Sequence, residues 1–316
     1  MPVSETKLPS ILSHKHYDAA SAFTPESLLH EARRQKGLST AAVLEICVLD
    51  PDGDIVRHLR ASGRADRYPG RACYHTDLYV FRHEGHEYGI VGCAVGAPFA
   101  VLIAEELFAS GCQFLISVTS AGQVLPVQVP PYFIVINRAL RDEGTSYHYM
   151  PPSDYSEADV HLAELAHDAL TAARIAVRAG ATWMTDAPFR ETHEAINAAS
   201  KAEILAVEME AAALYAFAKA RTVPASIAWP AKAITRSPTK WRRLRFKHIT
   251  LSKSVPRPER LSRPKSKFVT SESAFCRQLA SRSAILLSRS PSFMPKNAST
   301  RLIAPRSSGS SSPTSR

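Results

Sequence analysis

The sequence has no hydrophobic run long enough to cross a membrane. No stretch approaches the roughly 18–20 uninterrupted apolar residues that a transmembrane helix needs. The first ten residues, MPVSETKLPS, also lack the basic and then apolar layout of a secretory signal peptide. We therefore expect a protein that has no membrane partner and stays in the cytoplasm.

Paired cysteines and nucleotide-binding loops are missing as well. The five cysteines are odd in number, widely scattered and never in a C-x-x-C pair, so reduced thiols and no metal site are expected. His14 and His16 have the spacing of metal ligands, but no third ligand lies nearby in the sequence. Neither a G-x-G-x-x-G nor a P-loop pattern occurs, so no nucleotide cofactor is expected.

Acidic residues and glycine are scarce in the last third of the chain. Residues 221–316 hold 21 of the 39 Lys and Arg residues but only two of the 29 acids. This part therefore carries a net charge of +19, and the preceding 220 residues carry −9. It also has 20 Ser, 10 Pro and one Gly, without a sustained helical or strand period. We predict that 221–316 is a basic, low-complexity and mostly disordered tail.

The residues before this tail alternate between strand and helix signals. At 316 residues and 45% hydrophobic, the chain can bury a large core. Strand, helix and strand in succession predict a right-handed crossover, and hence an α/β fold with a mixed, largely parallel central sheet flanked by helices. We expect an N-terminal extension over 1–40 and a domain over 41–220. Its predicted strands lie within 41–50, 77–96 (two strands with a Glu-Gly turn), 112–124 and 131–140, and its helices at about 98–111, 160–174 and 208–220.

Two segments carry a resemblance to a known family. VGAPFAVLIAEELFASGCQFLISVTSAGQV (95–124), followed by VEMEAAALYAFA (207–218), resembles the nucleoside phosphorylase superfamily, in particular its uridine phosphorylase-like branch. The resemblance covers roughly 41–220. It implies an enzyme, a pentosyltransferase that cleaves the N-glycosidic bond of nucleosides. It also implies a homo-oligomer and no cofactor, with inorganic phosphate as co-substrate.

The Glu-Met-Glu motif is the first candidate site. Two carboxylates, Glu208 and Glu210, stand on either side of Met209 in an otherwise apolar run, where an unpaired charge is costly. By resemblance, Glu210 accepts hydrogen bonds from ribose hydroxyls, Met209 packs against the sugar, and Glu208 belongs to the same ribose site. The alternative is that both acids complement the dipole of a helix N-terminus.

The base and nucleophile sites also follow from the resemblance. Asp186, Phe189 and Arg190 would lie on the base side, with Phe189 as a stacking group. Core packing of Trp183 and Phe189 and a helix-capping role for Asp186 are the alternatives. Ser120 and nearby Gly122 would bind phosphate or water.

The arginines that grip phosphate in this family are not found. The family has a Gly and an Arg in the turn that corresponds to LDPDGD, but this chain has Leu49 and Gly53 at those two positions. The family has another Arg before its phosphate-binding loop, where this chain has Ser117, and a third from a neighbouring subunit, which Thr76 replaces. Without a guanidinium, a phosphate dianion loses its strongest hydrogen bonds. A phosphorylase would recruit other bases, such as Arg71, Arg82 or Arg138, whereas a nucleosidase would use water. The catalytic group itself is not identified.

Two further hypotheses concern the tail. After Arg221 we find none of the strand and acid pattern with which the family continues, and an abrupt change to Arg, Ser and Pro is what a shifted reading frame would produce. Alternatively, the protein is a noncatalytic nucleoside- or nucleic-acid-binding protein whose tail contacts phosphates. The choice between purine and pyrimidine bases is left open.

Overall fold

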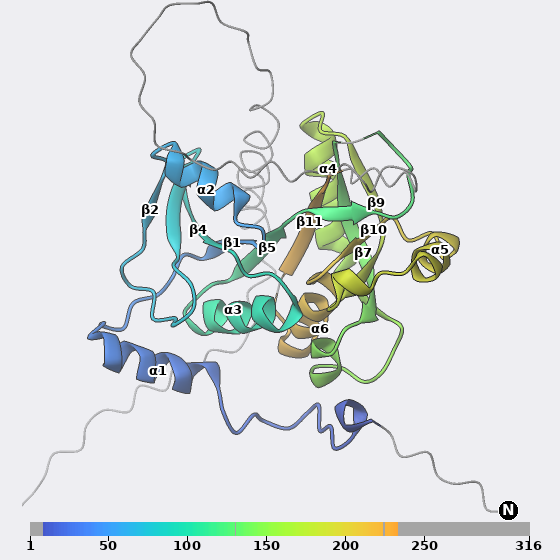
Figure 1. The fold of residues 1–316 in the computed structure, drawn as a ribbon. Coiled ribbons are helices and arrows are strands. Elements are labelled where there is room, and N and C mark those ends of the chain that lie inside the picture. The colour runs from blue at the N-terminus through green and yellow to red at the C-terminus, as the bar shows by residue number, and fades with distance from the viewer. Residues whose placement is uncertain (1–8, 130, 224, 233–316) are drawn as a thin grey trace, which may run out of the picture.

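The computed structural model describes residues 9–129, 131–223 and 225–232 (Figure 1). The helices of this part are α1 (Pro25–Lys36), α2 (Asp54–Ala61), α3 (Ala97–Ala109), α4 (Val160–Ala172), α5 (His193–Lys201) and α6 (Ala211–Arg221), with short 3-10 turns at Ser10–Leu12, Thr145–His148 and Pro188–Arg190. The strands are β1 (Ile46–Asp50), β2 (Ala65–Arg67), β3 (Tyr79–His83), β4 (His86–Gly92), β5 (Phe114–Val118), β6 (Ala121–Gln123), β7 (Tyr132–Asp142), β8 (Tyr155–Glu157), β9 (Val177–Thr185), β10 (Ala206–Glu208) and β11 (Ala225–Lys232). None of the helices described here is long and apolar enough to span a bilayer.

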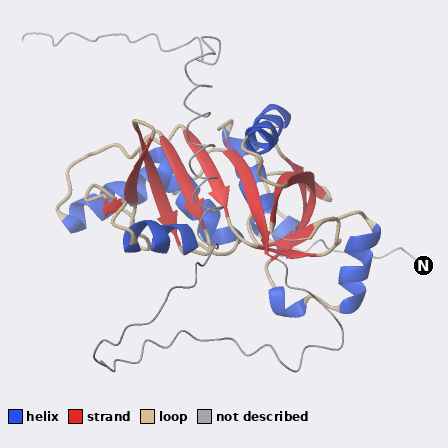
Figure 2. Ribbon diagram, turned by 90° about the horizontal axis from the view of Figure 1, so that it is seen from above, coloured by secondary structure: helices blue, strands red, loops and turns tan. Residues whose placement is uncertain are grey.

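The strands form one mixed sheet in the order β2-β3-β4-β1-β5-β11-β6-β10-β9-β7-β8. Strands β4, β1, β5 and β11 are parallel neighbours, whereas β2, β3 and β8 join at the edges by antiparallel pairing. Strand β11 also pairs with β7, which closes β11, β6, β10, β9 and β7 into a ring. Figure 2 shows this curved part beside the flatter parallel part. The expected mixed α/β fold is confirmed.

Alternate residues of the central strands face two different helical layers. Cys47 and Leu49 of β1 belong to the core shared with α3 and α6, whereas Ile46 and Val48 belong to the core shared with α2 and α4. Strands β5 and β7 divide their side chains in the same way. Because both faces of the sheet are covered here, every residue of β1 is buried, as the apolar run at 41–50 indicates.

Several predicted elements appear close to their expected positions. The hairpin of β3 and β4 turns at Glu84 and Gly85, both at positive φ, as a two-residue turn of this kind requires. Helix α3 starts beside Pro98 and is followed by Gly111 at φ +104°. The strand predicted over 112–124 is instead two strands, β5 and β6, interrupted where Thr119 and Ser120 leave the sheet.

The predicted N-terminal extension contains α1, whose Leu29 and Ala32 pack with Ala72 and Ala109. One expectation about chain organisation needs correction. The expectation that no strand follows Arg221 is wrong, because β11 pairs with β5, β6 and β7 and lies inside the sheet. These pairings join residues that are far apart in the chain, so the local sequence of this short Ala- and Pro-containing segment does not predict the strand. The rest of the predicted tail, 233–316, lies outside the described residues.

Candidate functional site

Four loops meet beyond the ends of β1, β4, β5 and β10, and three hydrogen bonds join them. The backbone N–H of Cys93 donates to the carbonyl oxygen of Asp50 (3.1 Å), and that of Ser120 donates to Oδ2 of Asp52 (2.6 Å). The backbone N–H of Gly96 donates to Oε1 of Glu210 (2.7 Å). Strands β1, β4 and β5 are parallel, so their carboxyl ends share one edge of the sheet, where α/β folds commonly bind ligands.

The turn after β1 depends on a buried aspartate. Asp50 is 1% exposed, and its two carboxylate oxygens accept hydrogen bonds from the N–H groups of Gly53 and Val56. Burial raises the pKa of Asp50 to about 6, although these hydrogen bonds act in the opposite direction. Gly53 has φ +75°, and a Cβ atom there would lie 2.5 Å from Sγ of Cys93. Glycine at this position is therefore required by the local backbone and packing.

The two glutamates of the Glu-Met-Glu motif have different local roles. Glu208 ends β10 and is 4% exposed, with Oε1 accepting from the Thr182 hydroxyl (3.0 Å). Its Oε2 accepts from the backbone N–H groups of Glu210 (2.7 Å) and Ala211 (2.8 Å). These are free N–H groups at the start of α6. Glu208 therefore interacts with a helix N-terminus, as the alternative interpretation of the motif proposed. Its carboxylate comes from strand β10, however, and not from the predicted helix.

Glu210 lies at the N-cap of α6, but its side chain does not cap that helix. Its carboxyl group is 2% exposed and reaches Gly96 at the start of α3. Burial raises the pKa of Glu210 to about 8, and the negative charges of Glu208 and Asp52 add to this effect. Burial likewise raises the pKa of Glu208 to about 7. Met209, between them, is half-buried.

The candidate nucleophile residues are divided between a loop and the sheet. Ser120 is half-buried in the loop between β5 and β6, with its N–H directed at Asp52. Gly122 lies within β6 and pairs with Val207 and Lys232. A Cβ atom on Gly122 would lie 2.9 Å from Cγ1 of Val207, so close packing accounts for this glycine.

The three base-side candidates lie at the surface. Phe189 is 99% exposed on the Pro188–Arg190 turn, so its core-packing alternative is wrong. Arg190 is also exposed. Asp186 is exposed, and its Oδ2 accepts from the N–H of Gly144 (3.0 Å); Ala187 holds the N-cap position, so Asp186 is not the cap. Trp183 is in the core, where its Nε1 donates to Asp142 (2.9 Å).

The arginines suggested as substitutes for the missing phosphate ligands have other partners. Arg71 is buried against Glu106, and exposed Arg82 pairs with Glu87. Arg138 stacks over Tyr155 at 4.6 Å from the ring centroid. Ser117, at the position of the loop arginine, is buried in β5, and its hydroxyl has no hydrogen-bond partner among the described residues.

Arg57 is a candidate that the sequence interpretation missed. It lies one helical turn after Gly53, and its Nη1 is 2.8 Å from the place that a Cβ of residue 53 would occupy. Its Nη2 donates to the carbonyl oxygen of Asp52 (2.8 Å) and to Asp54 (2.5 Å). The Arg57 guanidinium thus lies beside position 53 of the turn, where the family pattern has an arginine. The sequence analysis predicts no helix over 54–61; with one, the four-residue spacing of Gly53 and Arg57 would have placed the arginine beside the turn.

A second missed group organises the loop after β7. Arg141 is 5% exposed and donates to the Ser146 hydroxyl, the Ser153 hydroxyl and the carbonyl oxygens of Met150 and Pro151. Glu143 is buried beside it and accepts from the N–H of Ser146, and burial raises the pKa of Glu143. His148, at the end of the Thr145–His148 turn in this loop, contacts Lys15 through Nδ1 (2.8 Å).

Comparison with known proteins identifies the family of this chain. The sequence description of the phosphorylase superfamily matches residues 45–228, which is more than half of the chain. The chain therefore belongs to the phosphorylase superfamily, in agreement with the resemblance seen in the sequence.

Individual relatives are more distant. The chain is similar in sequence to two purine nucleoside phosphorylases of the DeoD type. The one from Streptococcus uberis is 27% identical over 46% of this chain and 63% of the relative. The one from Proteus mirabilis is 30% identical over 43% of this chain and 58% of the relative. The chain thus spans about three fifths of the length of these curated relatives. A crystal structure of uridine phosphorylase from Vibrio fischeri ES114 shares the fold, with a TM-score of 0.53 at 20% identity over 63% of this chain and 81% of that one.

Proposed function

We propose that this protein cleaves the N-glycosidic bond of nucleosides and holds the ribose at Glu210 and Met209. The observation that carries the proposal is the position of Glu210. Its carboxyl group is almost fully buried, yet it bridges two loops by accepting from Gly96 instead of capping its own helix. A family whose named relatives act on purine nucleosides and uridine supports a nucleoside substrate.

The electrostatics of the site suit a transition state with positive charge on the sugar. When the base departs, positive charge develops at C1′ and the ring oxygen, and a preorganised negative charge, here that of Asp52, stabilises it. Asp52 lies close enough to Glu210 to raise its pKa, so at least two carboxyl groups share this region. Glu208 acts through position, because its hydrogen bonds hold the start of α6. We assign the direct ribose contact to Glu210 alone.

The nucleophile is phosphate in the first candidate reaction. Arg57 would supply the guanidinium that the family pattern places at residue 53, and the Ser120 loop would supply the backbone N–H. An exposed arginine can rotate towards a bound dianion and form charge-assisted hydrogen bonds. In this reading phosphate replaces the Asp52 carboxylate at the Ser120 N–H.

Water is the nucleophile in the second candidate reaction, that of a nucleosidase. The hydrogen bond from Ser120 to Asp52 favours it, because a carboxylate that already occupies the donor repels a phosphate dianion. A neutral water molecule suffers no such repulsion, and Asp52 could accept its proton as a general base. The two candidates share the same ribose site.

The base would leave on the side of Asp186, Phe189 and Arg190. All three are exposed, so a purine or pyrimidine can stack on Phe189 without displacing core residues. A ring that is 99% exposed also fits a homo-oligomer in which a neighbouring subunit completes this side. Nucleic-acid binding by the basic tail concerns residues outside the described part.

The test is base release from a panel of purine and pyrimidine nucleosides by the purified full chain, followed by chromatography with and without phosphate. Free base is expected, and Glu210→Gln should lower kcat/KM by at least about 100-fold. Exposed Glu164 on α4 provides the matched control, Glu164→Gln. Stimulation by phosphate identifies a phosphorylase, and equal rates identify a nucleosidase. No base release from any nucleoside by a folded protein contradicts the proposal.

A further inference from the structure

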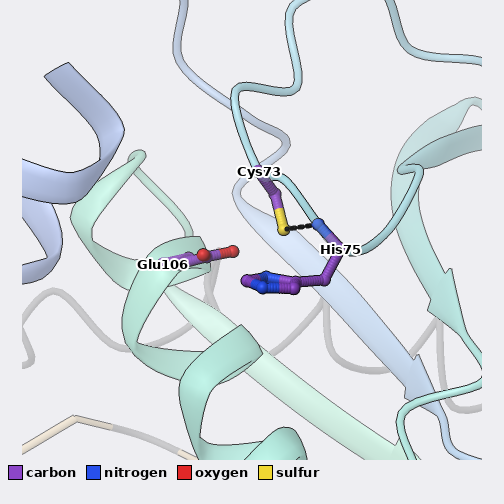
Figure 3. Close-up of side chains that lie close together, drawn as sticks. All are labelled: Cys73, His75 and Glu106. Carbon is purple, nitrogen blue, oxygen red and sulfur yellow. Dashed lines mark hydrogen bonds between the residues drawn. The ribbon is translucent and has the colours of Figure 1, made fainter. Parts of the chain in front are cut away.

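A second cluster of reactive side chains lies along α3. Cys73 and His75 come from the loop between β2 and β3, and Glu106 comes from the last turns of α3. One ligand atom from each of the three, sulfur, ring nitrogen and carboxylate oxygen, lies within 4.8 Å of the others. Figure 3 shows the three side chains converging on one point between the loop and the helix.

Glu106 contributes a carboxylate oxygen that lacks a partner. The residue is fully buried, and its Oε2 accepts from Nη2 of Arg71 at 2.7 Å. Its Oε1 has no hydrogen-bond partner within the described ranges 9–129, 131–223 and 225–232. A buried polar atom left unpaired is destabilising. The carboxylate points towards Cys73 and His75 in Figure 3.

Cys73 and His75 are arranged as a pair of ligands on a short turn. Sγ of Cys73 is buried and accepts from the backbone N–H of His75 (3.3 Å), which is the kind of bond that supports a metal-bound thiolate. The His75 ring packs edge-on against Phe99 of α3, with centroids 6.1 Å apart, yet the residue is exposed. An ion can therefore enter from the His75 side. Lys36 of α1 donates to the Cys73 carbonyl oxygen and holds the turn in place.

We propose that Cys73 Sγ, a ring nitrogen of His75 and Glu106 Oε1 bind one Zn²⁺ ion, with water in the fourth position. Sulfur, imidazole and carboxylate together are the ligand types that zinc takes in proteins, whereas calcium and magnesium prefer oxygen alone. Zinc–ligand distances of roughly 2.0–2.3 Å put neighbouring ligands about 3.5 Å apart. The exposed His75 side chain can rotate inwards to close the remaining gap.

Binding of the ion releases one proton. The Cys73 thiol releases its proton to solvent as the sulfur becomes a ligand. Glu106 keeps its hydrogen bond to Arg71 through Oε2 while Oε1 binds the ion. The bound metal would then tie the loop between β2 and β3 to α3, at some distance along the helix from Gly96 and the proposed ribose site. This site does not depend on the proposed enzymatic function.

The test is metal uptake by the chelator-treated full chain. After addition of Zn²⁺ and gel filtration, one bound ion per chain is expected, and Co²⁺ should show a thiolate charge-transfer band. His75→Ala should weaken binding at least about tenfold, and Cys73→Ser should abolish the band. The controls are His86→Ala and Cys93→Ser, both at exposed positions outside the cluster.

Two results would overturn the site. One is substoichiometric uptake by the full chain, and the other is uptake that neither His75→Ala nor Cys73→Ser changes. Because His75 is exposed, its substitution should leave the fold intact, which circular dichroism checks. The histidine variant therefore decides the question even if Cys73→Ser fails to fold.

Discussion

The backbone N–H of Ser120 donates a 2.6 Å hydrogen bond to Oδ2 of Asp52, which joins the loop after β5 to the turn after β1. The Asp52 carboxylate thus occupies the Ser120 N–H, which would otherwise be free to bind an anionic nucleophile. The bond also brings Asp52 near Glu210, whose pKa it helps to raise. The choice between phosphate and water thus depends on one carboxylate, which substitution can neutralise.

Asp52→Asn should increase the affinity for phosphate. The amide keeps an oxygen that can accept from Ser120 but removes the charge that repels a dianion. We expect the KM for phosphate to fall about tenfold, measured by base release at saturating nucleoside. Asp66→Asn, at an exposed position in β2, should leave it unchanged. A higher KM for phosphate in Asp52→Asn would show that Asp52 supports the anion site instead of opposing it.

Arg57→Ala should weaken phosphate use without affecting nucleoside binding. Its guanidinium is the cation placed over Gly53, and loss of a charge-assisted contact is worth about 1.5–3 kcal/mol. The KM for phosphate should rise at least about tenfold, with the KM for nucleoside unchanged. Arg64→Ala, just beyond α2, is the matched control because it removes the same charge from an exposed position. Equal effects of the two substitutions would mean that only net charge matters.

Stability should fall as the pH rises from about 5 to about 9. The pKa values of Glu208 and Glu210 are about 7 and about 8 in the folded protein, above the ordinary value of 4.5. Between these limits the unfolded chain loses its protons first, so the free energy of unfolding decreases. Each pKa unit corresponds to about 1.4 kcal/mol, and a fall of at least about 2 kcal/mol is expected.

Glu210→Gln provides the comparison for this pH dependence. The amide cannot ionise, so the variant should lose less stability between about pH 5 and about pH 9 than the wild type, as followed by denaturant unfolding. Glu164→Gln, on the exposed face of α4, should keep the wild-type slope. Identical slopes in all three proteins would contradict the buried, protonated state of the pair.

Tyr215→Phe should destabilise the fold and leave the site intact. The Tyr215 hydroxyl is buried under α6 and donates to the carbonyl oxygen of Ile136 in β7 (2.6 Å). Its removal leaves that carbonyl without the bond, at a cost of about 1–2 kcal/mol, which lowers Tm by about 3–6 °C. Tyr74→Phe, at a residue that is 41% exposed, should shift Tm by less than about 2 °C. An unchanged Tm in Tyr215→Phe would show that water replaces the bond.

The sequence predicted the elements whose signals are local. The Glu84-Gly85 turn, the Pro98 start of α3 and the apolar run of β1 each depend on a few adjacent residues. Elements with weaker local signals were missed or misjudged. The helices α2 and α5 and the strands β9 and β11 were not expected, and Glu208 was expected in a helix but ends a strand. For these strands, pairing with distant strands decided the conformation.

By itself, the sequence determined the α/β class and the superfamily, because periodicity and motif spacing are properties of the chain. Only the tertiary structure separated Glu208 from Glu210 and directed Arg57 back over Gly53. It also brought Glu106 to Cys73 and His75, about 30 positions earlier. Hydrogen bonds and burial act between residues that are close in space, and that closeness is set by sheet pairing and helix packing, not by distance along the chain.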